Sequence, residues 1–363
     1  MLEIVKEESQ AIRKKFADDR LTEIVNVSGE VDVEDLIPKE QCVYTLTNFG
    51  YIKRMPAAEY SLQHKGGRGV KGMTRREEDV TQTMFSCSSH DYIMFFTTFG
   101  RTYRLKGYEI PEGSRQSKGM NVVNLLPLES GEKISAMIRV PEFGEDHYYL
   151  CMVTRKGVIK RTRLDEYKNI RKSGIIAINL DEGDELAWVR LTDGEEDIFV
   201  ATRNGYGIRF HESDARAIGR TARGVRAIEL RGEDDEVIGM CAFGAETPED
   251  AQILTISETG VGRRSPLSEY RCQSRAGKGS FNYKIEKNGR VAAVLLVQES
   301  DDVILISSDG IVIRIAAGEI RSLSRTSRGV NVMRVSEGES VVSAVAIAAD
   351  DEETDEEETE ANE

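Results

Sequence analysis

The sequence has few of the residues from which catalytic and metal sites are usually built. It contains five cysteines, four histidines and one tryptophan among 363 residues. No two cysteines form a Cys-x-x-Cys pair, and the four histidines are far apart, so no metal-ligand spacing arises. We therefore expect no structural zinc site. The odd cysteine number predicts free, mostly buried thiols in a reducing compartment: Cys42, Cys87, Cys151, Cys241 and Cys272.

Motifs for catalysis are also missing. The chain has no G-x-S-x-G, no H-E-x-x-H and no G-x-x-x-x-G-K-[ST] sequence. No paired carboxylates or Cys/His arrangement recurs at a repeated position. We therefore predict a non-enzymatic domain, and a propeller glycosidase stays the enzymatic alternative.

Long apolar runs are absent, and the apolar segments have the length of strands. The N-terminal sequence MLEIVKEESQ carries acids and no apolar signal region. These features predict a cytoplasmic protein with no membrane partner.

The net charge of −14 at first argues against nucleic acid as a partner. Ten acidic residues, however, lie between Asp350 and Glu363, so residues 1–349 carry about −4. Within those residues Arg and Lys gather at fixed places, which is typical of a segregated basic surface. We expect residues 350–363 to be a disordered acidic tail. It serves either solubility or competition with an anion for the basic surface.

A pattern of about 50 residues repeats six times, which indicates a repeat architecture. Its first marker is a glycine that ends an apolar run, and its second is a glycine that closes a basic loop. They are 19 residues apart in five units and 17 apart in the third. The first glycines are Gly50, Gly100, Gly157, Gly205, Gly260 and Gly310, and the second are Gly69, Gly119, Gly174, Gly224, Gly279 and Gly329.

Each first glycine lies between two apolar segments, which predicts a hairpin. Asn204-Gly205 and Asp309-Gly310 are strong signals, because the commonest two-residue hairpin turn needs positive φ at both central residues. After the basic loop we expect a second strand pair with its own turn, as at Leu180–Leu186. Six four-stranded units bury their faces only around a ring. The chain is therefore predicted to be all-β, with a propeller at residues 39–349 after an N-terminal helix and linker at residues 1–38.

An arginine stands four residues after every first glycine, and an acid stands nine residues after it. Two interpretations are open: a ring of phosphate contacts, or an Arg–carboxylate pair that stabilises each unit. Because the arginine and the acid recur together, we favour the Arg–carboxylate pair. The arginines are Arg54, Arg104, Arg161, Arg209, Arg264 and Arg314, and the acids are Glu59, Glu109, Glu166, Asp214, Glu269 and Glu319.

The basic loops repeat cations without a repeated acid inside the loop, so we interpret them as an anion-binding edge. The third unit differs from this pattern, because its loop, Asn169–Gly174, is shorter by two residues. In the first loop three glycines let backbone N–H groups approach a ligand closely, and cations flank them. The predicted DNA-binding residues are Gln63, His64, Lys65, Gly66, Gly67, Arg68, Gly69, Lys71, Arg115, Lys118, Arg220, Arg223, Arg275, Lys278, Arg325 and Arg328.

The run QHKGGRG resembles the glycine-rich basic box of the DNA gyrase A subunit, with His64 in place of the usual Arg. The segments TNFGYIKRMPAAEY, GRTARGVRAIEL and SRTSRGVNVMRV resemble the C-terminal domain of that subunit, and IRKKFADDRLTEI resembles the segment after its breakage-reunion core. The resemblance covers nearly the whole chain. It implies a six-bladed β-pinwheel of four-stranded antiparallel blades that exchange strands.

The resemblance also implies a function. In this family double-stranded DNA wraps around the basic perimeter, without sequence specificity and with a fixed hand. Wrapping supports ATP-dependent negative supercoiling by an A2B2 holoenzyme in the cytoplasm, at the nucleoid. The partners implied are DNA, the gyrase A catalytic core and the gyrase B subunit. This chain lacks the catalytic tyrosine domain, so ATP and Mg would belong to the holoenzyme and no cofactor to this chain. The alternatives are the matching domain of topoisomerase IV and a propeller scaffold for proteins. A WD40-type scaffold would show Trp-Asp signatures, whereas Val189 follows Trp188.

Overall fold

The computed structural model describes residues 2–16, 33–57, 81–114, 117–140, 147–309 and 311–347. The chain divides into two compact units, Met1–Pro38 and Lys39–Glu363. The box at residues 63–69 and the acidic tail lie outside the described residues, as do Lys71 and Arg115.

The first unit contains the predicted helix, α1 (Leu2–Phe16), and the 3-10 turn η1 (Val33–Leu36). In α1, Glu3 lies in the first turn and Arg13, Lys14 and Lys15 lie in the last, which suits the helix dipole. None of its side chains is buried. Among the described residues no helix has both the length and the apolar character needed to cross a membrane.

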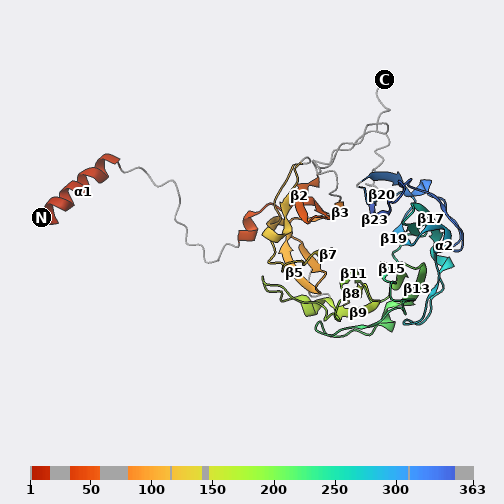
Figure 1. Ribbon diagram of the computed structural model, residues 1–363. Coiled ribbons are helices and arrows are strands. Elements are labelled where there is room, and N and C mark those ends of the chain that lie inside the picture. Colours follow the sequence, from red (N-terminus) through yellow and green to blue (C-terminus); the bar gives the residue numbers. More distant parts are fainter. Residues whose placement is uncertain are drawn as a thin grey trace, which may run out of the picture. The chain divides into compact units, whose positions relative to one another are not determined.

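The second unit is all-β and is built from six antiparallel sheets arranged around a common axis (Figure 1). Three long strands of each sheet come from one repeat unit. In sheets one to three they are β1 (Gln41–Thr47), β2 (Tyr51–Pro56), β3 (Thr81–Ser88); β4 (Tyr92–Thr97), β5 (Arg101–Lys106), β7 (Ile134–Val140); and β8 (Tyr149–Thr154), β9 (Val158–Arg163), β11 (Leu186–Thr192). In sheets four to six they are β12 (Asp197–Thr202), β13 (Tyr206–His211), β15 (Val237–Phe243); β16 (Gln252–Ser257), β17 (Val261–Pro266), β19 (Val291–Val297); and β20 (Asp302–Ser307), β21 (Val312–Ala316), β23 (Val341–Ile347).

Five of these sheets have a fourth, two-residue strand that comes from the next unit. Each follows directly after a second glycine and pairs with the outer hairpin strand of the preceding sheet. These strands are β6 (Met120–Asn121), β10 (Ile175–Ile176), β14 (Val225–Arg226), β18 (Ser280–Phe281) and β22 (Val330–Asn331). The β-propeller and its repeats are thus confirmed, but the predicted second strand pair is wrong. Around the turn at residues 180–186, β10 joins the second sheet and β11 joins the third.

Short helical turns connect these strands. They are η3 (Gly107–Glu109), η4 (Val122–Asn124), η5 (Leu164–Tyr167), η6 (Glu212–Asp214), η7 (Leu267–Glu269), η8 (Ala317–Glu319) and the four-residue α2 (Ile285–Asn288). Five of them, η3 and η5 to η8, follow the outer hairpin strand of a unit and lead toward its basic loop.

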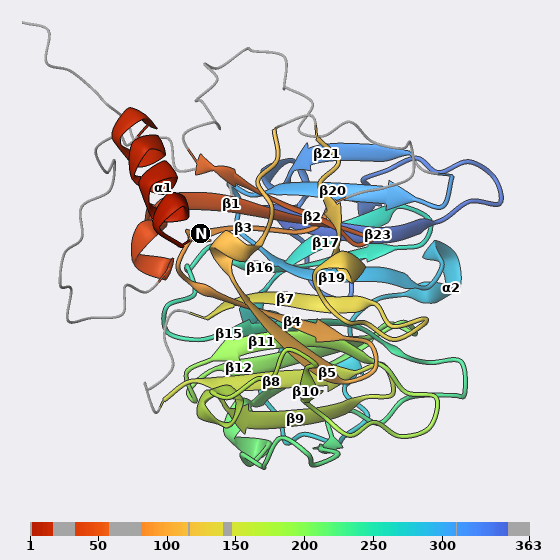
Figure 2. The same ribbon diagram turned by 90° about the vertical axis from the view of Figure 1, so that its left-hand side faces the viewer.

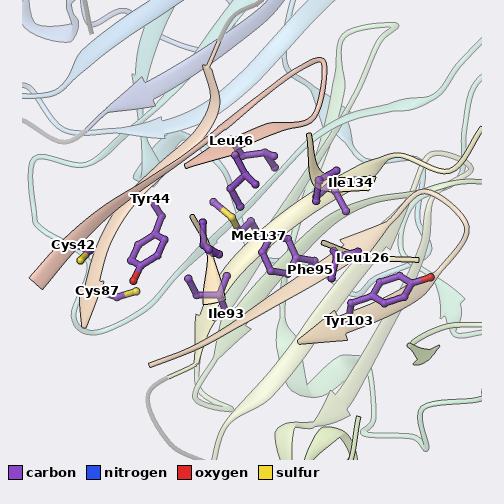
Figure 3. Packing of buried hydrophobic residues seen from close by; sticks show 13 residues of the cluster. Cys42, Tyr44, Leu46, Cys87, Ile93, Phe95, Tyr103, Leu126, Ile134 and Met137 are labelled. Carbon is purple, nitrogen blue, oxygen red and sulfur yellow. The ribbon is translucent and has the colours of Figure 1, made fainter. Parts of the chain in front are cut away.

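The core lies between neighbouring sheets. In β4 successive side chains alternate between faces, so Ile93 and Phe95 pack toward the first sheet while Met94 and Phe96 pack toward the third. Figure 3 shows the first of these interfaces, where Tyr44 and the residues around it meet the second sheet. Because both faces are buried, the strands read as continuous apolar runs instead of alternating ones.

The innermost strands β3, β7, β11, β15, β19 and β23 lie beside one another around the axis, and the last, β23, lies beside β3. Figure 2 shows the same strands from the side. The disc therefore closes on itself, and the hairpins and exchanged strands face outward.

The hairpins are present as predicted, but their turn type differs. The Gly205 N–H donates to the Thr202 carbonyl at 3.0 Å, so Arg203 and Asn204 are the central residues and Gly205, with φ +82°, follows the turn. This is a three-residue loop with a bulge, not a two-residue turn. The Thr202 hydroxyl accepts from the Tyr206 N–H at 3.4 Å, and Thr47, Thr97, Thr154 and Ser257 repeat this contact.

The predicted buried thiols are confirmed: all five cysteines are free and four are buried, with Cys272 exposed. Burial, and to a lesser degree the negative charge of Asp91, raises the pKa of Cys87 to about 12.

Candidate nucleic-acid interface

In the second to sixth units the described part of the basic loop runs along the outer edge of the preceding sheet. We call the basic loop of a unit its rim loop. In the fourth unit, Ile218 N–H donates to the Arg161 carbonyl at 2.9 Å before the loop, and β14 pairs with β9 after it. The loop residues between them therefore project from the perimeter of the disc. The loops ending at Gly119, Gly174, Gly279 and Gly329 are held in the same way by β6, β10, β18 and β22.

The second glycine is required by this close approach. Gly224 has φ +97°, and a Cβ on it would lie 2.6 Å from the Ile159 carbonyl oxygen. The same carbon on Gly279 would lie 2.7 Å from the Gly207 oxygen. Glycine alone satisfies both the positive φ and the lack of space.

The cation four residues before the second glycine is half-buried in the three loops where it is described. Arg220 donates from Nη1 to the Ile176 carbonyl at 3.2 Å, and Arg275 donates to Arg226 at 2.9 Å. Arg325 donates to the Phe281 carbonyl. Each accepting carbonyl belongs to the exchanged strand of the preceding unit. A guanidinium has five donors, so these arginines hold the rim together and can also face an anion.

The cation just before the second glycine is exposed at Arg223, Lys278 and Arg328 and half-buried at Lys118. Arg223 and Lys278 form ion pairs with Asp181 and Glu229, whose carboxylates come from the preceding unit. The expectation that no acid recurs inside the loops holds, but acids recur beside them. In the other two loops, Lys118 lies 3.7 Å over the Tyr51 ring and Arg328 donates to the Asn288 side chain at 3.0 Å.

The arginines four residues after the first glycine are structural, as favoured, but their predicted partners are wrong in four units. Arg161, Arg209, Arg264 and Arg314 pair with Glu212, Asp197, Glu299 and Asp302 instead of the repeated acid. Two of these acids begin the strand opposite the arginine in the hairpin, so hairpin register decides the pairing. Four of the arginines that stand four residues after a first glycine also donate to backbone carbonyls of the next unit: Arg54 to Ile110, Arg104 to Lys168, Arg209 to Tyr270 and Arg264 to Ile320.

A buried cation lies beneath alternate rim loops. Lys53, Lys160 and Arg263 occupy the same position of the outer hairpin strand in sheets one, three and five, and each is at most 1% exposed. Lys53 donates to the carbonyls of Ser114 and Ser117 at 3.0 and 3.2 Å. Lys160 donates to Ala177 at 2.5 Å and to Arg220, and Arg263 donates to Ser327 at 3.2 Å and to Arg325.

Burial disfavours the charged form of these groups. Burial above all, together with the nearby Arg220 charge, lowers the pKa of Lys160 to about 7, although the charge of Glu166 acts in the opposite direction. Burial lowers the pKa of Lys53 and of Arg263 as well. The guanidinium of Arg263 keeps its charge, because arginine is not deprotonated in proteins.

Comparison with known proteins identifies this architecture. A family described as DNA gyrase C-terminal domain, beta-propeller, matches residues 43–88, 91–141, 148–193, 196–240, 251–298 and 301–348. The chain belongs to this family. The resemblance drawn from the box and its flanking segments is thereby confirmed.

The DNA gyrase A subunit of Staphylococcus aureus strain MRSA252 is 43% identical to the chain over 99% of the chain's length. The match spans only 41% of that relative. Among solved structures, the C-terminal domain of a DNA topoisomerase IV superposes with a TM-score of 0.73 at 27% identity, covering 86% of this chain and 94% of that one. A DNA gyrase A C-terminal domain gives 0.66 at 26% identity, covering 85% and 99%.

One set of rim cations of this gyrase-family domain was missed from the sequence. Lys168, Arg216, Arg271 and Arg321 each stand eleven residues after a first glycine, and all four are exposed. They precede the rim loops, in the segments that enter the perimeter. Aligning the units on their first glycines alone would have revealed them.

Proposed function

We propose that this domain binds duplex DNA along its rim and wraps it with a fixed hand, as the non-catalytic part of a DNA gyrase. The observation that carries the proposal is the repetition of cationic loops at the outer edge of a closed disc. A perimeter of repeated cations meets the regularly spaced phosphates of a bent duplex without reading its bases. The proposed contacts are the rim-loop cations, including Lys65, Arg68 and Lys71, together with Arg216, Arg271 and Arg321.

Energetics support many weak contacts in place of a few strong ones. Bending about 20–30 base pairs through a large angle costs on the order of 1–6 kcal/mol by elastic estimates. Each neutralised phosphate contributes about 0.9 to the slope of log affinity against log salt. We therefore expect sequence-tolerant binding that weakens steeply with salt. Affinity that stays constant between low and moderate salt would contradict rim binding.

The partners proposed are the gyrase A catalytic core and gyrase B subunit of an A2B2 holoenzyme, in the cytoplasm at the nucleoid. The sequence relatives favour gyrase, whereas the two solved structures resemble the chain to a similar degree. The matching domain of topoisomerase IV is therefore the second candidate, and it would bind DNA with weaker chiral wrapping.

A topological experiment tests the proposal. Nicked circular plasmid is incubated with the protein and sealed with ligase, and the change in linking number is measured after deproteinisation. We expect a positive shift that the double variant Lys65→Ala, Arg68→Ala loses. The control is Lys6→Ala, Arg13→Ala in α1, which removes the same charge from the other unit. Binding without any shift would favour the topoisomerase IV candidate.

A further inference from the structure

The buried side chain of Lys160 lies beneath a rim loop but not on the surface that faces DNA. It is fully buried in β9, and its ammonium group donates to the carbonyl of Arg220 in the rim loop of the next unit. Its second acceptor, the Ala177 carbonyl at 2.5 Å, also receives the Tyr167 hydroxyl at 3.1 Å. The loop is thus attached to the sheet through its own backbone, at the residue whose side chain is a proposed phosphate contact.

We propose that Lys160 is a positioning residue that holds the Arg220–Gly224 loop in its DNA-binding shape, and that DNA binding at this loop is coupled to protonation of Lys160. The inference rests on the proposed DNA-binding function and deepens it. Charge-assisted hydrogen bonds are roughly twice as strong as neutral ones, so the ammonium form holds the Arg220 carbonyl more firmly than the amine does.

The charged groups around Lys160 give the coupling its direction. Arg220 faces it from the rim loop and disfavours its proton, whereas Glu166 on η5 favours it. Tyr167 presents a hydroxyl whose pKa is raised by burial, so it stays neutral near pH 7. A DNA phosphate beside Arg220 would offset the repulsion between Arg220 and Lys160. The pKa of Lys160, about 7 in the free protein, would then rise, so binding takes up protons. By linkage, affinity must fall as the pH rises above that value.

The residue equivalent to Lys160 in the fifth sheet, Arg263, suggests a decisive variant. Arg263 makes equivalent contacts to the Arg325 and Ser327 carbonyls and does not titrate. Replacing Lys160 by Arg therefore imitates a solution that this fold already uses. The positioning charge is retained, and the titration is removed.

The experiment measures affinity for a short duplex from pH 6.0 to 8.5 by calorimetry, in two buffers of different ionisation enthalpy. Wild type is compared with Lys160→Arg, with Lys160→Met and with Lys156→Met. The last is a matched control, because Lys156 is exposed in the turn between β8 and β9 and its ammonium group donates to the Glu182 carbonyl at 2.7 Å, not to a carbonyl of the Arg220–Gly224 loop. The histidines and carboxylates are the same residues in all four proteins, so differences between them report on Lys160 and the groups that face it.

We expect wild type to lose roughly fivefold more affinity across this range than Lys160→Arg, and to take up a fraction of a proton that Lys160→Arg does not. Lys160→Met should bind at pH 6.0 as weakly as wild type binds at pH 8.5, and Lys156→Met should follow wild type. Equal pH profiles and equal proton uptake in wild type and Lys160→Arg would overturn the inference, even if Lys160→Met does not fold. Absence of DNA binding by wild type at every pH would instead overturn the proposed function on which it rests.

Discussion

Two kinds of rim loop alternate among the five loops that the structure describes, and they are held in place differently. The loops ending at Gly119, Gly224 and Gly329 lie over Lys53, Lys160 and Arg263, and we call them charge-backed. The loops ending at Gly174 and Gly279 lie over Tyr103 and Ile208, and we call them neutral-backed. A Cβ on Gly174 would lie 2.5 Å from the Tyr103 ring, and one on Gly277 would lie 3.8 Å from Ile208.

The backbone of each kind of loop matches its support. In the charge-backed loops the same turn recurs, with N–H groups of Ser117, Ala222 and Ser327 donating to carbonyls three residues earlier. These loops aim carbonyl oxygens at the cation beneath them. The neutral-backed loop of the fifth unit instead contains Ala276 at φ +66° and donates from Ala276 N–H to the Ala227 carbonyl at 2.7 Å. Each buried cation thus lies beneath a loop that shares one turn and presents carbonyl oxygens to it.

Exchanging the buried residues beneath the two kinds of loop should give the largest change in the free energy of unfolding. Ile208→Lys would bury a charge beneath a loop whose turn differs from that of the charge-backed loops, and we expect a loss of about 3–5 kcal/mol in the free energy of unfolding. Lys160→Ile removes a buried charge and should change that free energy by at most about 1–2 kcal/mol. Urea denaturation measures both. Equal costs for the two exchanges would show that the loops do not differ in how they accept charge.

The closing glycine, by contrast, is common to both kinds of loop. Gly224→Ala and Gly279→Ala combine a positive φ with a clash against backbone, so each should cost about 2–4 kcal/mol in the free energy of unfolding. Gly232→Ala is the control, because Gly232 has φ +107° but a Cβ on it would meet no atom within 4 Å, and it should cost about 1 kcal/mol. If one closing glycine tolerated alanine and the other did not, the loops would differ in path as well as in support.

The dependence of stability on pH should also distinguish the two kinds of loop. Lys160 has a folded-state pKa of about 7, below the ordinary lysine value near 10.4 in the unfolded chain. Between these values the unfolded state binds the extra proton, so stability contributed by this group rises with pH and is lost as the pH falls toward 7. From pH 7.5 to 9, wild type should gain on Lys160→Met by up to about 1.4 kcal/mol per pH unit.

The matching change in a neutral-backed sheet is the control for this measurement. Ile208→Met contains no titrating group, so its stability should remain parallel to wild type over the same range in thermal melts. A constant difference between wild type and Lys160→Met from pH 7.5 to 9 would show that Lys160 does not lose its proton there.

The sequence predicted the units well because their markers are backbone requirements. Positive φ and close approach fix glycines such as Gly205 and Gly224, and these recur wherever the geometry recurs. The exchange of strands could not be derived from local patterns. The segment that includes β10 and the segment that includes β11 read as one hairpin around a turn, and only packing between units assigns them to different sheets.

Part of the candidate site was predicted from the sequence, for a related reason. Cations beside the second glycine were found because they recur at a fixed spacing. The buried cations were not found, because Lys53, Lys160 and Arg263 alternate with Tyr103, Ile208 and Ile313, so the signal appears in every second unit. Ion-pair partners were also missed. Asp181, the partner of Arg223, lies in the preceding unit, too far along the chain to belong to a local motif.

We expect the smallest effect from replacing the acids that pair with rim-loop cations. One such acid pairs with each kind of loop, so the two kinds can be compared directly. Asp181 pairs with Arg223 of a charge-backed loop, and Glu229 lies 3.9 Å from Lys278 of a neutral-backed loop. Exposed ion pairs of this kind contribute about 0–1 kcal/mol, so Asp181→Asn and Glu229→Gln should leave the unfolding free energy nearly unchanged. Each should tighten DNA binding at low salt by about two- to threefold, because a phosphate no longer displaces a carboxylate. The gain should vanish at high salt, where exposed charges are screened. Binding titrations at two salt concentrations measure this, and a gain that persists at high salt would mean that the acids act on the shape of the loop instead of its charge.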